Sequence, residues 1–141
     1  MNEIALFLPC FNEAQRLNIQ FILNFIQEQE HLIDFYFIDD GSKDSTSEII
    51  FAHLVNNKNS FLINLTYNMG KGNALRKGIL EIYNKPYKYF GFVDADLDIP
   101  LSQVVKLHEQ LDNSDYLITI TSRNLYNDFN LLGFNSPLLA A

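Results

Sequence analysis

The feature that most constrains the fold of this chain is a repeated alternation of short apolar runs with longer amphipathic segments. Four runs rich in aliphatic and aromatic residues have the composition of buried strands, and they span residues 4–8, 33–38, 61–65 and 89–93. A fifth strand is predicted from about Tyr116 to Ile120. Strands that are apolar on both faces and alternate with helices are typical of a parallel sheet covered by helices on both sides. The sequence therefore predicts an α/β fold, a three-layer αβα sandwich with a mostly parallel sheet.

Helix-start signals support this pattern. Asn12 with Gln15 has the spacing of a capping box, and so has Ser45 with Glu48, so a helix is predicted to begin at each pair. A glycine-rich segment over residues 68–73 precedes a third helical pattern.

Length and composition limit the classes of protein that fit. With 141 residues, 48% of them hydrophobic, the chain is expected to form one domain with a substantial core. Periodicity ends at Arg123, so we expect a core over about 1–123 and an irregular apolar tail over 124–141. A formal net charge of −7 argues against a nucleic-acid partner.

The expected location follows from what the sequence lacks. Its single cysteine excludes an intrachain disulfide framework. It shows no basic leader and no apolar run of about 20 residues. We expect a cytoplasmic protein, either free or peripheral at the inner face of the membrane. The apolar tail favours self-association, so a homodimer is a further expectation.

Three carboxylates in alternate positions follow the fourth strand, at Asp94, Asp96 and Asp98. Such groups repel one another unless a cation lies between them. Mg²⁺ and Mn²⁺ prefer oxygen ligands, and Mg²⁺ is commonly held by one or two carboxylates together with substrate phosphates. The stretch therefore indicates a metal–diphosphate site, and the alternative is an acidic turn with solvated side chains.

Polar clusters follow all four of the first predicted strands. In open α/β sheets, ligands bind outside the carboxyl ends of the strands, so four such loops are expected to share one edge. Taken alone, Asp39 and Asp40 could bind a nucleobase or ribose, or form a turn. Lys71, in the glycine-rich segment, could contact a diphosphate or be a surface charge.

Taken together, these segments resemble a known family. Residues 8–13 (LPCFNE), 38–44 (IDDGSKD), 68–74 (NMGKGNA) and 93–96 (VDAD) are similar in order and spacing to the family 2 glycosyltransferases. The resemblance implies a Rossmann-like GT-A fold and an inverting, metal-dependent sugar transfer. The implied donor is a UDP- or GDP-linked sugar. The implied acceptor is a hydroxyl of a growing glycan or a membrane lipid phosphate, as in polyprenyl-phosphate glycosyltransferases.

The resemblance also implies roles for particular residues. Asp39 would contact the base, in a pocket lined by Pro9, Phe11 and Glu13. Asp94 would face the ribose or the sugar. The remaining implied contacts are Asp96 as ligand of Mg²⁺ or Mn²⁺, Asp98 as an extra metal ligand, and Arg123 near the donor phosphates.

Three alternatives remain open at this point. Family members are longer, and no general base is identified here, because nothing around the late carboxylate Asp128 matches the family's motif. The chain could therefore be a donor-binding module without activity, either truncated or a pseudoenzyme. A receiver-type signalling domain would place its aspartate pair after the first strand, where Pro9 and Cys10 stand. A dehalogenase-like phosphatase would place its D-x-D motif on its first core strand.

Overall fold

The computed structural model describes residues 2–113, 115, 118–123 and 129–134. The chain divides into two compact units, Met1–Asp98 and Ile99–Ala141. No helix among the described residues is both long and apolar enough to span a membrane.

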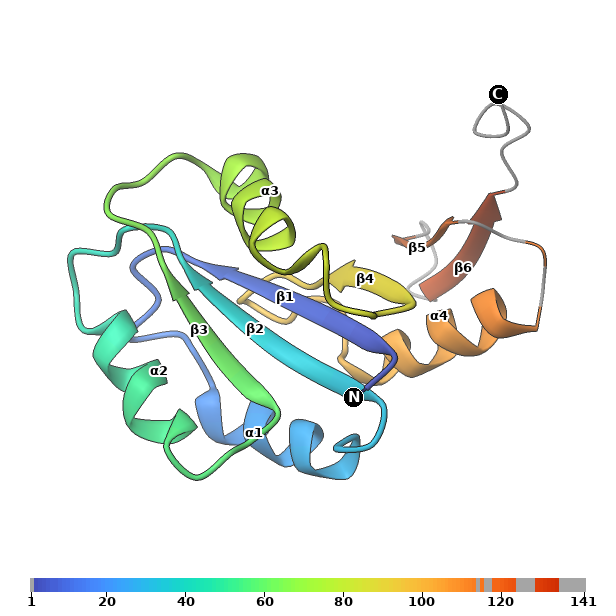
Figure 1. Cartoon of the computed structure of the whole chain (residues 1–141), viewed down its shortest axis with the longest axis horizontal. Coiled ribbons are helices and arrows are strands. Elements are labelled where there is room, and N and C mark those ends of the chain that lie inside the picture. The colour runs from blue at the N-terminus through green and yellow to red at the C-terminus, as the bar shows by residue number, and fades with distance from the viewer. Residues whose placement is uncertain (1, 114, 116–117, 124–128, 135–141) are drawn as a thin grey trace. The chain divides into compact units, whose positions relative to one another are not determined.

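The first unit alternates strand and helix throughout. Its elements are β1 (Ile4–Cys10), α1 (Ile19–Glu28), β2 (Ile33–Asp39), α2 (Thr46–Leu54), β3 (Ser60–Asn64), α3 (Lys71–Ile82) and β4 (Tyr89–Phe92). The four strands form one parallel sheet in the order β3-β2-β1-β4. In Figure 1, α3 covers one face of this sheet, and α1 and α2 cover the other. The predicted α/β class and the mostly parallel sheet are therefore confirmed.

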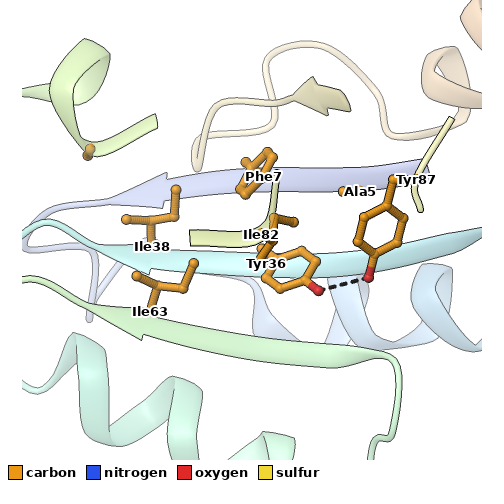
Figure 2. Close-up of a cluster of buried hydrophobic side chains, with 8 residues drawn as sticks. Ala5, Phe7, Tyr36, Ile38, Ile63, Ile82 and Tyr87 are labelled. Carbon is orange, nitrogen blue, oxygen red and sulfur yellow. Dashed lines mark hydrogen bonds between the residues drawn. The ribbon is translucent and has the colours of Figure 1, made fainter. Parts of the chain in front are cut away.

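One cluster of the core lies where the two central strands meet α3. All seven residues of β2 are buried, as are six of the seven residues of β1. Figure 2 shows side chains of both strands, among them Phe7, Tyr36 and Ile38, gathered with Ile82 of α3 and Tyr87. Because both faces of these strands are covered, their sequences are continuous apolar runs.

A polar network crosses one end of this core. The hydroxyl of Tyr87 donates to Oδ2 of Asp34 over 2.6 Å and lies 2.8 Å from the hydroxyl of Tyr36. Asn2 donates to Oδ1 of the same carboxylate over 2.9 Å, and Lys85 donates to the Tyr36 hydroxyl over 3.1 Å. The network therefore satisfies polar groups that would be unfavourable if buried alone.

The first helix begins later than the sequence predicts. Asn18 is the N-cap of α1, and its side chain accepts from the backbone N–H of Phe21 over 3.2 Å. Asn12 has a φ of 55°, a left-handed conformation, and its side chain accepts from the N–H of Lys43 over 2.8 Å. The expected Asn12 cap was wrong because this asparagine joins two loops instead.

The second unit contains α4 (Ser102–Asp112) and an antiparallel pair, β5 (Ile118–Arg123) and β6 (Phe129–Phe134). The predicted fifth strand corresponds to β5, which continues to Arg123. The expected irregular tail differs from the structure over residues 129–134, since these pair as β6. Residues 124–128 and 135–141 lie outside the described residues.

Candidate functional site

A cleft of about 290 Å³ opens in the first unit at the carboxyl ends of β1 and β4 and beside the first turn of α3. Six of the residues predicted to form a site line it: Pro9, Phe11, Glu13, Lys71, Asp94 and Asp96. The structure thus brings together segments of the chain that are more than 80 residues apart in sequence. A parallel sheet places its loops this way because all its strands end at the same edge.

The loop after β1 contributes an ion pair that the sequence analysis missed. Arg16 donates to Oε1 of Glu13 over 2.7 Å, and both residues line the cleft. The side chain of Glu13 is 13% exposed, whereas that of Arg16 is 68% exposed. Oε2 of Glu13 is buried and has no hydrogen-bond partner among the described residues. A ligand with an N–H or O–H group could satisfy this acceptor. The spacing of three residues was the available signal for this pair.

Two adjacent carboxylates follow β2, and they have different contacts. Oδ1 of Asp39 accepts from the backbone N–H of Ser42 over 3.1 Å and also from its hydroxyl. Asp39 is 5% exposed and is not among the residues that line the cleft. Asp40, which the sequence offered beside Asp39 as a possible contact for a base or ribose, lines the cleft.

Asp40 fixes the loop that leads into α3. Its two carboxylate oxygens accept from the N–H groups of Met69 and Gly70, each over 2.9 Å. Gly41 follows with a φ of +69°, and a Cβ atom there would lie 2.5 Å from the carbonyl carbon of Tyr67. The turn after β2 therefore packs against the loop before α3, and only glycine fits at its closest point.

Lys71 is the first residue of α3 and extends toward the acidic segment. Its ammonium group forms an ion pair with Oδ1 of Asp94. The same nitrogen lies 5.1 Å from the centroid of the Phe92 ring, at cation–π distance. The side chains of Lys71 and Asp94 are 50% and 46% exposed, so this pair lies at the open side of the cleft.

The acidic segment forms a tight turn after β4. The N–H of Leu97 donates to the carbonyl of Asp94 over 3.0 Å, and the N–H of Asp98 donates to Oδ1 of Asp96 over 3.2 Å. Asp96 and Asp98 are exposed, and Asp98 is not among the cleft-lining residues. Carboxylate oxygens are the type of ligand that Mg²⁺ and Mn²⁺ prefer, and Asp94 already pairs with a positive charge, the Lys71 ammonium. The donor atoms present are therefore compatible with a divalent ion.

Two further residues considered in the sequence belong to the second unit. Arg123 ends β5 in the second unit, and its side chain is outside the described part of the structure. Asp128, the late carboxylate considered as a base, also lies outside the described residues.

Comparison with solved structures identifies the class of fold. The chain resembles TarS 1–349 of S. aureus, with a TM-score of 0.52 and 19% identity, over 90% of this chain and 43% of that one. This similarity identifies the fold as that of a GT-A glycosyltransferase, as the sequence resemblance implied. Residues 5–137 match the family model described as glycosyl transferase family 2. The chain belongs to this family.

Curated relatives agree with this assignment. A dolichyl-phosphate beta-glucosyltransferase of Trichomonas vaginalis is 33% identical over 56% of this chain and 27% of its own length. A poly-beta-1,6-N-acetyl-D-glucosamine synthase of Staphylococcus epidermidis is 29% identical over 92% of this chain and 31% of its own length. The chain thus spans less than half the length of the curated relatives it matches.

Proposed function

We propose that the cleft binds a nucleotide-diphosphate-sugar together with Mg²⁺ or Mn²⁺, and that the chain is the donor-binding part of an inverting glycosyltransferase. The observation that carries this proposal is the meeting of Glu13, Lys71, Asp94 and Asp96 in one cleft at the edge of the sheet. Carboxylates and a cation at that position offer partners for a base, a diphosphate and a metal.

At the nucleoside end, we assign acceptors to the base and the ribose. Both hydrogen bonds from Ser42 go to Oδ1 of Asp39. We therefore propose that Oδ2 of Asp39 accepts a hydrogen bond from the imide N–H of uracil or guanine. The unpartnered Oε2 of Glu13 would accept from a second donor on the nucleoside. Pro9 and Phe11 would provide apolar contacts.

At the diphosphate end, Asp96 would hold the metal, with Asp98 as an extra ligand and Asp94 facing the ribose or sugar. When bound, the metal would neutralise charge on the departing diphosphate. Lys71 would place its ammonium against a phosphate oxygen, and Arg123 is proposed as a further phosphate contact.

For the acceptor, the relatives provide two classes. By their names, one relative acts on dolichyl phosphate and another synthesises a poly-N-acetylglucosamine. We therefore propose a lipid phosphate or a growing glycan. The test is to incubate the chain with donor, Mn²⁺ and each class of acceptor. A glycosyltransferase would convert donor and acceptor to product, whereas a module that only binds donor would leave both unchanged.

The experiment that tests donor binding is calorimetry of the chain with UDP, GDP and ADP, with Mn²⁺ and with a chelator. We expect UDP or GDP to bind more tightly than ADP, and chelation to weaken that binding. Asp96→Ala should remove the metal-dependent part, whereas the exposed control Asp115→Ala should behave like the wild type. Asp39→Asn should weaken binding by about 1–3 kcal/mol, because it replaces an acceptor with a donor. Equal nucleotide affinity with and without metal would contradict the metal assignment, and preference for ADP would contradict the role of Asp39.

A further inference from the structure

The ion pair between Lys71 and Asp94 places a cation of the protein itself beside the proposed metal site. The backbone of Lys71 is anchored, since the preceding residues Met69 and Gly70 donate to Asp40 and the N–H of Ala74 donates to the carbonyl of Gly70 over 2.9 Å. Its long side chain is half exposed and retains room to move. The start of the side chain is therefore fixed while its charged end can exchange partners.

We propose that Lys71 is a built-in counter-ion: while it is paired with Asp94, its charge disfavours a free divalent cation at the neighbouring Asp96, and it leaves Asp94 when a nucleotide diphosphate enters. This inference rests on the proposed function, and it adds that metal and nucleotide bind cooperatively rather than independently. The Lys71–Asp94 ion pair would thus determine whether the proposed metal site is occupied when no nucleotide is bound.

The contacts of the cleft support this effect. While the ammonium is paired with Asp94, an approaching divalent ion must displace it or meet an added positive charge nearby. Asp96 then remains as the other acidic cleft residue after β4, and its Oδ1 accepts from the N–H of Asp98. Mg²⁺ binds weakly to so few protein ligands, because it usually relies on substrate phosphates as well.

A nucleotide diphosphate changes this balance. Its oxygens offer the ammonium a more highly charged partner than Asp94, and they also supply ligands to the metal. Once the ammonium has left, the negative charge of Asp94 is no longer neutralised, and this favours a divalent ion at Asp96. Each ligand therefore raises the affinity for the other by the same factor. Phe92 stays close to the ammonium on the apolar side, which limits the directions in which Lys71 can move.

The test is titration of Mn²⁺ into nucleotide-free protein, followed by electron paramagnetic resonance of unbound Mn²⁺. The informative variant is Lys71→Met, which keeps an unbranched side chain one atom shorter and removes its charge. Lys77→Met is the matched control, because Lys77 is an exposed residue of the same helix and its loss changes the net charge equally. Lys71→Arg retains the charge, and Lys71→Met with Asp94→Asn removes both partners.

We expect Lys71→Met to bind Mn²⁺ about two- to fivefold more tightly than the wild type without nucleotide, the size of effect that a half-exposed ion pair supplies. Lys77→Met and Lys71→Arg should resemble the wild type, and the double variant should lose the gain. The cooperativity between Mn²⁺ and UDP or GDP should be smaller in Lys71→Met than in the wild type, and the part that comes from diphosphate oxygens binding the metal directly should remain. Circular dichroism verifies that each variant is folded.

Unchanged Mn²⁺ affinity in Lys71→Met would overturn the inference. An equal gain of Mn²⁺ affinity in Lys77→Met would also overturn it, because it would indicate only a general effect of net charge. These outcomes are distinct from failure of the proposed function. That failure would appear as absence of nucleotide binding by the wild type at any Mn²⁺ concentration, whatever the nucleotide-free titrations show.

Discussion

Cys10 lies at the last position of β1, where the strand meets the cleft. Its side chain is 1% exposed, and its Sγ lies 3.6 Å from the carbonyl oxygen of Leu8. Burial raises the pKa of this thiol far above its ordinary value, and the nearby carboxylates of Glu13 and Asp39 raise it further. The folded chain therefore keeps Cys10 protonated and unreactive, as expected of a small apolar residue.

This raised pKa predicts a loss of stability in alkaline solution. Above about pH 8.5, the ordinary cysteine pKa, the unfolded chain releases the thiol proton but the folded chain keeps it, so the free energy of unfolding falls as pH rises. For one proton the slope approaches about 1.4 kcal/mol per pH unit. Urea unfolding from pH 7.5 to 9.5 in the presence of reductant should show this decline in the wild type.

The control for this prediction is Cys10→Ala, which has no thiol to titrate. Its overall stability should be lower because a buried atom is removed. Its curve of stability against pH should nevertheless be flatter than that of the wild type over the same range. Two parallel curves would show that Cys10 ionises alike in both states.

Among the secondary elements, α3 connects the core with the cleft. Its first residue, Lys71, contacts Asp94, while Ala74, Gly78 and Ile82 are buried. A Cβ atom at Gly78 would lie 2.5 Å from Cδ1 of Ile38 and 3.2 Å from Cε1 of Phe7. The absence of a side chain at this position allows the helix backbone to approach β1 and β2 closely.

We therefore expect Gly78→Ala to destabilise the protein although alanine favours helices. The propensity gain is about 1 kcal/mol, and overpacking typically costs about 1–3 kcal/mol, so the clash should dominate. Gly72→Ala is the matched control in the same helix, since a Cβ atom there meets no atom within 4 Å. Thermal unfolding should show a lower midpoint for Gly78→Ala and an equal or higher one for Gly72→Ala. Equal effects of both substitutions would contradict close packing at Gly78.

The positions of some secondary elements were predictable from local sequence, whereas the positions of others depend on contacts with distant residues. The first four strands were located to within two residues, because buried parallel strands are continuous apolar runs. The start of α1 was misplaced because Asn12 and Asn18 are both suitable caps, and the loop containing Ser42 and Lys43 determines the conformation of Asn12. β6 has no alternating pattern and is defined by pairing with β5.

The candidate site shows the same division. Its position followed from the rule that loops meet at the carboxyl edge of a parallel sheet. The use of Asp40 as a backbone anchor and the pairing of Lys71 with Asp94 were not predictable, because each joins residues that are remote in the sequence. The contact of Asp39 with Ser42 is local and agrees with the turn that the sequence offered, but the sequence did not decide between a turn and a ligand contact.

At the scale of the whole chain, the pairing of strands in the sheet of the first unit should determine which backbone segments resist local unfolding most strongly. β1 pairs with both β2 and β4, and β2 pairs with both β1 and β3, whereas β3 and β4 each pair with one strand among the described residues. Both central strands are also covered on their two faces. Opening them therefore requires disruption of most of the core.

Native-state hydrogen exchange should follow this order. We expect amides of β1 and β2 to exchange only through global unfolding, with protection equal to the free energy of unfolding. Amides of β3 and β4 should exchange faster, through smaller openings at the sheet's edges. Mass spectrometry of peptides from each strand measures this difference. Uniform protection across the four strands would instead indicate that the sheet opens as one unit.

The polar network of Asp34, Tyr36 and Tyr87 has a consequence for the fidelity of folding. Apolar burial alone distinguishes poorly between strand registers, because Phe35 and Phe37 flank Tyr36 and are as apolar as their neighbours. A slip of β2 by one residue would turn Asp34 and Tyr36 to the opposite face of the sheet. Their polar atoms would then be buried away from Tyr87, at about 1–3 kcal/mol for each unsatisfied group. The network thus makes the native register of β2 more stable than misaligned registers that bury a similar amount of apolar surface.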